Sequence, residues 1–217
     1  MKSHPKAICT SLQVKIFAIL LVIILSGTHS DAQTRNVIWY TPSKAATING
    51  LAIGPFESNF FEKSQTINGI TINGGLVGLF APFVFANSPT DGCFKVRTGK
   101  KVIDSLTKAY KADTLRYIHN GLVLSGAGML TDKVSGILIS PWFGHTKEVN
   151  GLVINGVWNW NNKVTGVCIG ADNECFEMKG IQIGLVNRAV KLKGVQIGLW
   201  NKNMKRGLPF INWNFKS

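Results

Sequence analysis

The sequence is poor in the residue types that usually carry catalysis. It has four histidines, four cysteines and 11 acidic residues in 217 positions. His119 and His145, the two histidines beyond the N-terminal segment, stand 26 positions apart, and neither lies in a recognised motif. The chain lacks an H-E-x-x-H zinc motif, a phosphate-binding P-loop and a G-x-G-x-x-G fingerprint. The sequence therefore predicts a protein that is not an enzyme and that has no cofactor.

Metal-binding patterns are also lacking. Asp172, Glu174 and Glu177 cluster in one turn, but their spacing differs from that of an EF-hand loop, so a solvated turn is the favoured interpretation. Cys168 and Cys175 are not spaced as C-x-x-C. They bracket the turn-rich stretch IGADNE, and a disulfide could join them across a hairpin if the chain is exported. Whether they are bridged is left open, and no metal site is predicted.

The apolar run at 16–25 is ten residues long, about half of what a membrane-spanning helix needs. It follows three lysines, Lys2, Lys6 and Lys15, and precedes the small-x-small pattern Ser30-Asp31-Ala32. This order is typical of a secretory signal peptide. We therefore predict a signal peptide at 1–32 and a single exported domain at 33–217. The alternative is an N-terminal helix that stays in place as a membrane anchor.

Acidic residues are outnumbered by 24 lysines and arginines, which gives a net charge of +13. Removal of the predicted signal peptide takes away three lysines and one aspartate and leaves +11. Such a charge favours anionic partners. Because export is expected and the basic residues are spread between turns, outer-membrane lipid or another anionic envelope surface is favoured over nucleic acid. No protein partner is predicted.

What the sequence does contain is a repeat built on glycine. The repeat glycines are Gly50, Gly69, Gly121, Gly136, Gly151, Gly166, Gly180, Gly194 and Gly207. From Gly121 onward the steps are 15, 15, 15, 14, 14 and 13 residues. Within a copy such as GIQIGL at 180–185, apolar residues fall at every second position, which indicates a β-strand. A repeat of this length predicts a repeat architecture.

Two all-β architectures place one strand in each repeat. An eight-residue strand covers about 26 Å, and the six remaining residues return only about 20 Å, so a parallel coil closes poorly. We therefore favour an antiparallel meander that closes into an up-and-down β-barrel of about 12 strands. A parallel β-solenoid is the alternative, favoured by the identical polarity of the copies. Helical spacing also predicts one short helix near 100–112.

Aromatic residues stand near the expected strand ends. In a membrane barrel, aliphatic side chains face lipid and aromatic side chains gather at the interfaces. The predicted interface aromatics are Trp158, Trp160, Trp200, Trp213 and Phe215. The last segment, GLPFINWNFKS, resembles the aromatic-rich final strand of outer-membrane barrels, apart from its trailing Lys216-Ser217. In a water-soluble sheet, by contrast, the aliphatic face would pack inward.

The segment KGIQIGLVNRAVKLKGVQIGLWNKN resembles exported surface-repeat proteins of spirochaetes and related envelope-bearing bacteria, whose tandem phrase is G-[LV]-Q-[IL]-G-[LIV]-[VIL]-N. The match is close at 180–187 and 194–201, whereas Val123, Leu138 and Val153 replace the glutamine in earlier copies. The resemblance implies a β-repeat domain at the outer membrane or cell surface and no catalytic residues. We predict a non-enzymatic envelope protein with a structural, adhesive or binding role. The alternative is a secreted or periplasmic soluble β-repeat module that binds anionic glycans.

Overall fold

The computed structural model describes residues 34–55, 64–76, 80, 108 and 114–215, all within one compact unit, Ala32–Ser217. These residues form ten strands in one sheet. The strands are β1 (Thr34–Tyr40), β2 (Thr47–Gly54), β3 (Gln65–Asn73), β4 (Tyr117–Ser125), β5 (Gly128–Ser140), β6 (Phe143–Asn155), β7 (Trp158–Ile169), β8 (Asp172–Ile183), β9 (Val186–Asn203) and β10 (Gly207–Asn214).

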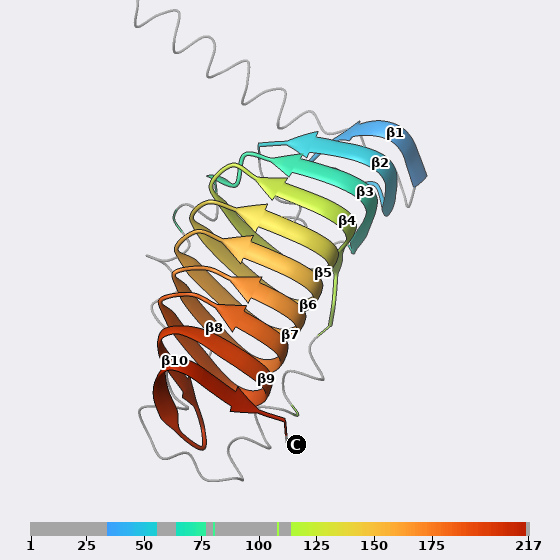
Figure 1. The fold of residues 1–217 in the computed structure, drawn as a ribbon. Coiled ribbons are helices and arrows are strands. Elements are labelled where there is room, and N and C mark those ends of the chain that lie inside the picture. Colours follow the sequence, from blue (N-terminus) through green and yellow to red (C-terminus); the bar gives the residue numbers. More distant parts are fainter. Residues whose placement is uncertain (1–33, 56–63, 77–79, 81–107, 109–113, 216–217) are drawn as a thin grey trace, which may run out of the picture. The chain divides into compact units, whose positions relative to one another are not determined.

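Each strand pairs with the next one along the chain, and every pairing from β1 to β9 is parallel (Figure 1). Only the last pair, β9 with β10, is antiparallel. Successive repeats therefore stack as coils of a parallel β-solenoid. The predicted all-β repeat is confirmed, but the favoured antiparallel barrel was wrong and the alternative of a solenoid is correct.

The coil closes because the strands continue around it. β5 to β9 are 12 to 18 residues long, much longer than the eight-residue segment expected from the sequence. Within these strands the chain bends at each repeat glycine, and pairing skips one residue, such as Lys147 between Thr146 and Glu148. The straight segment after the glycine is therefore short. The residues that bring the chain back around the coil are themselves part of a strand. The arithmetic against a solenoid assumed one straight strand and failed for this reason.

Eight repeat glycines stand in register, each one paired with the next from Gly50 to Gly194. All eight have positive φ, for example 137° at Gly166. A Cβ added at Gly166 would lie well under 3.0 Å from the backbone carbonyl oxygen of Gly151 in the preceding coil. Glycine is therefore required both by the backbone conformation and by the close approach of neighbouring coils. The ninth repeat glycine, Gly207, begins the antiparallel strand β10 instead.

Two apolar clusters fill the interior of the stack. The larger one runs from Val123 on β4 to Leu192 on β9 and includes Leu138, Val153 and Met178. The smaller one contains Ala45, Ile48, Ala52 and Ile67, with Trp39 packed against it. Two predicted features lie outside the described residues: the signal peptide at 1–32 and the helix near 100–112, apart from Lys108.

Candidate functional site

One outer wall of the solenoid is apolar across all ten strands. On this wall two positions of each strand face outward. On β2 to β9 they are the first and third residues after the repeat glycine, which parallel register aligns from coil to coil, and β1 and the antiparallel β10 contribute the residues that pair with them. We call these two rows the apolar ribbon. Its members are Ile38, Tyr40, Leu51, Ile53, Ile70, Ile72, Leu122, Leu124, Ile137, Ile139, Leu152, Ile154, Val167, Ile169, Ile181, Ile183, Val195, Ile197, Ile211 and Trp213.

No side chain of the apolar ribbon is buried. Exposure is 38% at Ile181 and 39% at Ile137 in the middle of the stack, and it reaches 60% at Ile38 at one end. Side chains in register cover one another's flanks, as cross-strand pairs do, and only their outer surface is free. A sheet that faces water usually carries polar residues outward and apolar residues inward. On this wall the outward positions are apolar as well, so the aliphatic side chains that were expected either in lipid or in the core lie on the surface of a solenoid.

The apolar ribbon is long. Ten strands spaced about 4.8 Å apart span about 43 Å, and two rows on one strand are about 7 Å apart. With the width of the side chains, the ribbon covers at least ~300 Å², which is the size at which apolar patches on soluble proteins are often functional. Leu185, Leu199 and Trp200, which are 55%, 62% and 50% exposed, extend it at the turns after β8 and within β9.

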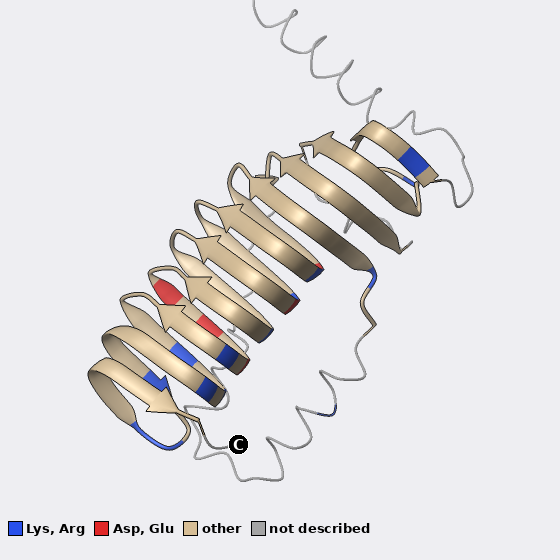
Figure 2. Ribbon diagram, turned by 45° about the vertical axis from the view of Figure 1, so that its right-hand side comes forward, with Lys and Arg blue, Asp and Glu red and all other residues tan. Residues whose placement is uncertain are grey.

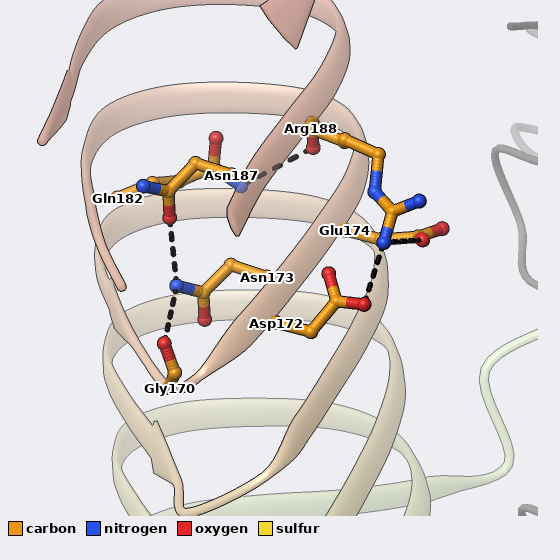
Figure 3. A network of polar contacts seen from close by, with 7 residues as sticks. All are labelled: Gly170, Asp172, Asn173, Glu174, Gln182, Asn187 and Arg188. Carbon is orange, nitrogen blue, oxygen red and sulfur yellow. Dashed lines mark hydrogen bonds and ion pairs between the residues drawn. The ribbon is translucent and has the colours of Figure 1, made fainter. Parts of the chain in front are cut away.

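The inward side chains that alternate with the ribbon are apolar on β4 to β7 and are glutamines on β8 and β9. Gln182 and Gln196 are fully buried, and Gln196 Nε2 donates to Gln182 Oε1 at 2.7 Å. Asn173 and Asn187 lie inside neighbouring coils (Figure 3). Asn173 Nδ2 donates to Asn187 Oδ1 at 2.8 Å. Asn187 Nδ2 donates in turn to Asn201 Oδ1 at 2.8 Å. These buried amides thus pair with amides of neighbouring coils, as burial of polar groups requires.

The other wall carries an ionic group around Arg188. One guanidinium nitrogen, Nη2, lies 2.5 Å from Asp172 Oδ2 and 2.9 Å from Glu174 Oε1 (Figure 3). Glu174 is only 2% exposed, so this contact lies out of bulk water. The arginine therefore holds two of the three acidic side chains that had been considered for calcium. Among the described residues, no group of three potential ligands is placed to hold a metal ion.

Charged residues also form a ladder at the corner before the glycine. In register from β5 to β9 stand Lys133, Glu148, Lys163, Glu177 and Lys191. Their signs alternate, and Glu148 Oε1 lies 3.9 Å from one lysine of the ladder and 3.7 Å from the next. In Figure 2 the blue and red segments of these coils border the wall that carries the arrowheads, which is itself tan. The charge ladder favours the observed register and leaves the apolar ribbon uncharged.

The predicted interface aromatics do not form belts. Trp158 and Trp160 are half-buried on β7, where Trp158 stacks edge-on with Trp142 at 5.2 Å between ring centroids. Trp200, Trp213 and Phe215 are exposed near the C-terminal end of the stack. The aromatic residues therefore divide between packing on the second wall and exposure at one end.

Cys168 and Cys175 face one another across the interior of a coil, not across a hairpin. Both are buried free thiols in this structure, and burial together with a hydrogen bond to Cys175 raises the pKa of Cys168. A disulfide between them stays a prediction. Burial also lowers the pKa of His119 to about 4 and lowers that of His145. His119 Nδ1 lies 3.2 Å from the hydroxyl of Thr71, so the buried imidazole has a hydrogen-bond partner in the interior.

A scan against protein-family models, a search of curated proteins and a search of solved structures gave no match. The resemblance to exported surface-repeat proteins therefore stays a prediction. Within the described ranges, no helix has the length and apolarity to cross a membrane.

The sequence pattern identified the ribbon residues as one aliphatic flank of the strands, but it assigned them to a closed barrel and not to a solenoid. The identical polarity of the copies was the available signal, because identical polarity implies parallel stacking. In parallel stacked coils only one flank of each strand faces the interior. The side chains of the other flank therefore lie on the surface.

Proposed function

We propose that this protein is a non-enzymatic component of the cell envelope that lies on an anionic lipid surface through its apolar ribbon. The observation that carries the proposal is the uninterrupted pair of outward apolar rows across ten strands. An exposed apolar surface of this extent typically marks a site of membrane or protein interaction. A ribbon that runs across neighbouring strands of one wall matches an extended partner surface such as a bilayer.

Charge supports lipid as the partner. Lys179 and Lys193 are exposed side by side on the position just before the glycine, and so they border the ribbon at its C-terminal end. The ribbon itself contains no acidic residue. Lysines beside an apolar surface attract the anionic headgroups of a leaflet, each contributing about 1 kcal/mol near the surface. Trp200 and Trp213, each about half exposed, have the amphipathic rings that favour the membrane interface.

Vesicle binding tests this function. The triple variant Ile181→Thr, Ile183→Thr and Ile197→Thr keeps β-branched side chains, which suit strands, but makes the C-terminal part of the ribbon, on β8 and β9, more polar. We expect the unaltered protein to float with vesicles that contain phosphatidylglycerol and the variant to bind at least about tenfold more weakly. Asn150→Thr, on the polar row beside the ribbon, is the matched control and should bind normally. Equal binding by the triple variant and the unaltered protein would refute the proposal.

Binding of an anionic glycan is the second candidate. The observation that favours it is the set of lysines on β8 and β9, Lys179, Lys191 and Lys193, which lie close together because the strands are in register. This function predicts binding to a sulfated polysaccharide that weakens steeply with salt and does not need the ribbon. The triple isoleucine variant therefore separates the two candidates, since it would bind heparin normally.

A further inference from the structure

A cavity opens at the C-terminal end of the stack. It has a volume of about 370 Å³ and lies among β8, β9 and the turn that joins β9 to β10. Its apolar residues include Met178, Val190 and Leu192, which are 0%, 4% and 4% exposed. These side chains belong to the end of the interior, where no further parallel strand follows β9 among the described residues. The volume is within the range of pockets that hold small molecules.

The cavity is basic at its rim. Lys179, Lys191, Lys193 and Lys205 all line it, against one acidic residue, Glu177. Glu177 Oε1 is 3.3 Å from the Nζ of Lys179, so the acid offsets one of the four positive charges. The remaining excess of positive charge beside a low-dielectric apolar floor attracts an anion more strongly than the same lysines would on an open surface.

The fold holds these residues in place. Lys179 and Lys193 occupy the same register position on neighbouring strands. Asn214 Nδ2 donates to the backbone oxygen of Leu192 at 2.7 Å, which ties β10 to the cavity floor. Lys205 Nζ donates to Asn214 Oδ1 at 3.2 Å, so its ammonium group is oriented from the turn toward the same edge. The antiparallel strand that ends the stack thus also completes the cavity.

We propose that this cavity binds an amphiphilic anion, which places a phosphate, sulfate or carboxylate head at the lysines and a short apolar tail on Met178, Val190 and Leu192. A bare anion leaves the apolar floor in contact with water, and a neutral apolar molecule gains nothing from the net positive charge of the rim. Only a ligand with both parts matches both halves of the lining. This site goes beyond the proposed membrane docking and does not depend on it.

Calorimetry with decyl phosphate below its micelle concentration tests the site on the full domain. We expect one saturable site, with inorganic phosphate and the neutral decyl maltoside each binding at least about tenfold more weakly. Tighter binding of inorganic phosphate than of decyl phosphate would show a simple anion site, and equal binding of decyl maltoside would show a simple apolar one. Either result would overturn the proposal.

Variants locate the site. Lys193→Gln and Lys205→Gln should each weaken decyl phosphate binding by about three- to tenfold. Lys163→Gln removes the same charge from the charge ladder outside the cavity and should leave binding unchanged. The ribbon variant Ile181→Thr, Ile183→Thr, Ile197→Thr should also bind decyl phosphate normally, so the site can fail while vesicle docking holds, and the reverse. Binding that none of the lysine variants alters would mean adsorption elsewhere and would refute the site.

Discussion

The N-terminal and C-terminal coils each contain a ladder of asparagines. The N-terminal ladder lies on the outer surface of the solenoid, and the C-terminal ladder lies in its interior. Toward the N-terminus, Asn36, Asn49, Asn68 and Asn120 stand outside, in the position just before the glycine, and three hydrogen bonds of 2.8–3.1 Å join them. Toward the C-terminus, Asn159, Asn173, Asn187 and Asn201 stand inside and are fully buried. The outer amides have water as an alternative partner, whereas the inner amides have only the neighbouring coil.

The position of the ladder indicates which coils depend on their neighbours for stability. An outer ladder adds little net stability because each amide exchanges a protein partner for water. An inner ladder makes each coil necessary to the next, because a missing neighbour leaves a buried amide unsatisfied. The N-terminal coils rely instead on the small cluster around Ile48 and Ile67. We therefore expect the C-terminal coils to resist unfolding more than the N-terminal ones, and hydrogen exchange measures this directly.

The largest expected effect is at the glycines. Gly166→Ala introduces a Cβ that meets the carbonyl oxygen of Gly151, in a coil held on both sides. We expect a loss of about 3–5 kcal/mol in the free energy of unfolding, measured in urea. Gly50→Ala meets Val37 in the first described coil, which pairs with a single strand among the described residues and can shift, so about 1–3 kcal/mol is expected. Equal losses at both sites would contradict the difference between inner and terminal coils.

The asparagine ladders give the next largest effect. Asn187 donates to the backbone oxygen of Ile197 at 2.9 Å and to Asn201, and it accepts from Asn173. Asn187→Ala leaves these buried groups unsatisfied and should cost about 3 kcal/mol of unfolding free energy. The matched change Asn68→Ala on the outer ladder should cost less than about 1 kcal/mol. If the two variants unfold alike, the contrast between the ladders is wrong.

Acid should weaken the fold through its buried histidines. Burial lowers the pKa of His119 from 6.5 to about 4. Between these pH values the unfolded chain binds a proton that the folded chain does not, so stability falls as the pH drops from 6.5 toward 4, by about 3 kcal/mol at most. The pKa of His145 is lowered mainly by burial, so its effect has the same sign. His119→Gln should reduce the pH dependence of the unfolding free energy, and an unchanged slope would contradict the assignment.

The smallest expected effect is at Val37, which takes the glycine position in the first described coil. Its φ is 79°, and its side chain is 74% exposed. The Cβ is tolerated because no described coil precedes it, and it obstructs the edge against further pairing, a protection that sheet edges need. Val37→Gly should relieve strain and raise the unfolding free energy by about 1 kcal/mol. Light scattering should show end-to-end association of the variant, while a strictly monomeric variant would argue against this role.

Much of the fold could be predicted from the repeat. The strand period of GIQIGL at 180–185, the glycine spacing and the turn residues between copies indicated all-β repeats, and the register of Gln182 with Gln196 was part of the solenoid alternative. The barrel was favoured because the glycine was treated as a point within a straight strand. A positive φ, such as 131° at Gly180, is not encoded in residue type alone, so the bend that closes the coil was missed.

The candidate sites were less accessible to sequence reasoning. The alternation of Ile181 and Ile183 with Gln182 shows that a strand has two unlike flanks, but not which flank lies inside. The cavity at the C-terminal end depends on Lys205 and Asn214, which the β9–β10 turn brings beside Leu192 from more than ten positions away. Such contacts follow from the antiparallel pairing of β10, and no local pattern predicts them.

The residue pattern alone was enough to predict the strands, their repeat length, the amides that could pair with copies of themselves and an excess of positive charge. Those properties are local, because they depend on residue type and on spacing along one chain. The tertiary arrangement settled that the coils run parallel and which aliphatic side chains face outward. A coil encloses only one flank of each strand, and in register that flank packs as the apolar cluster of β4 to β7 or as the paired glutamines of β8 and β9, so the aliphatic side chains of the other flank stay on the surface.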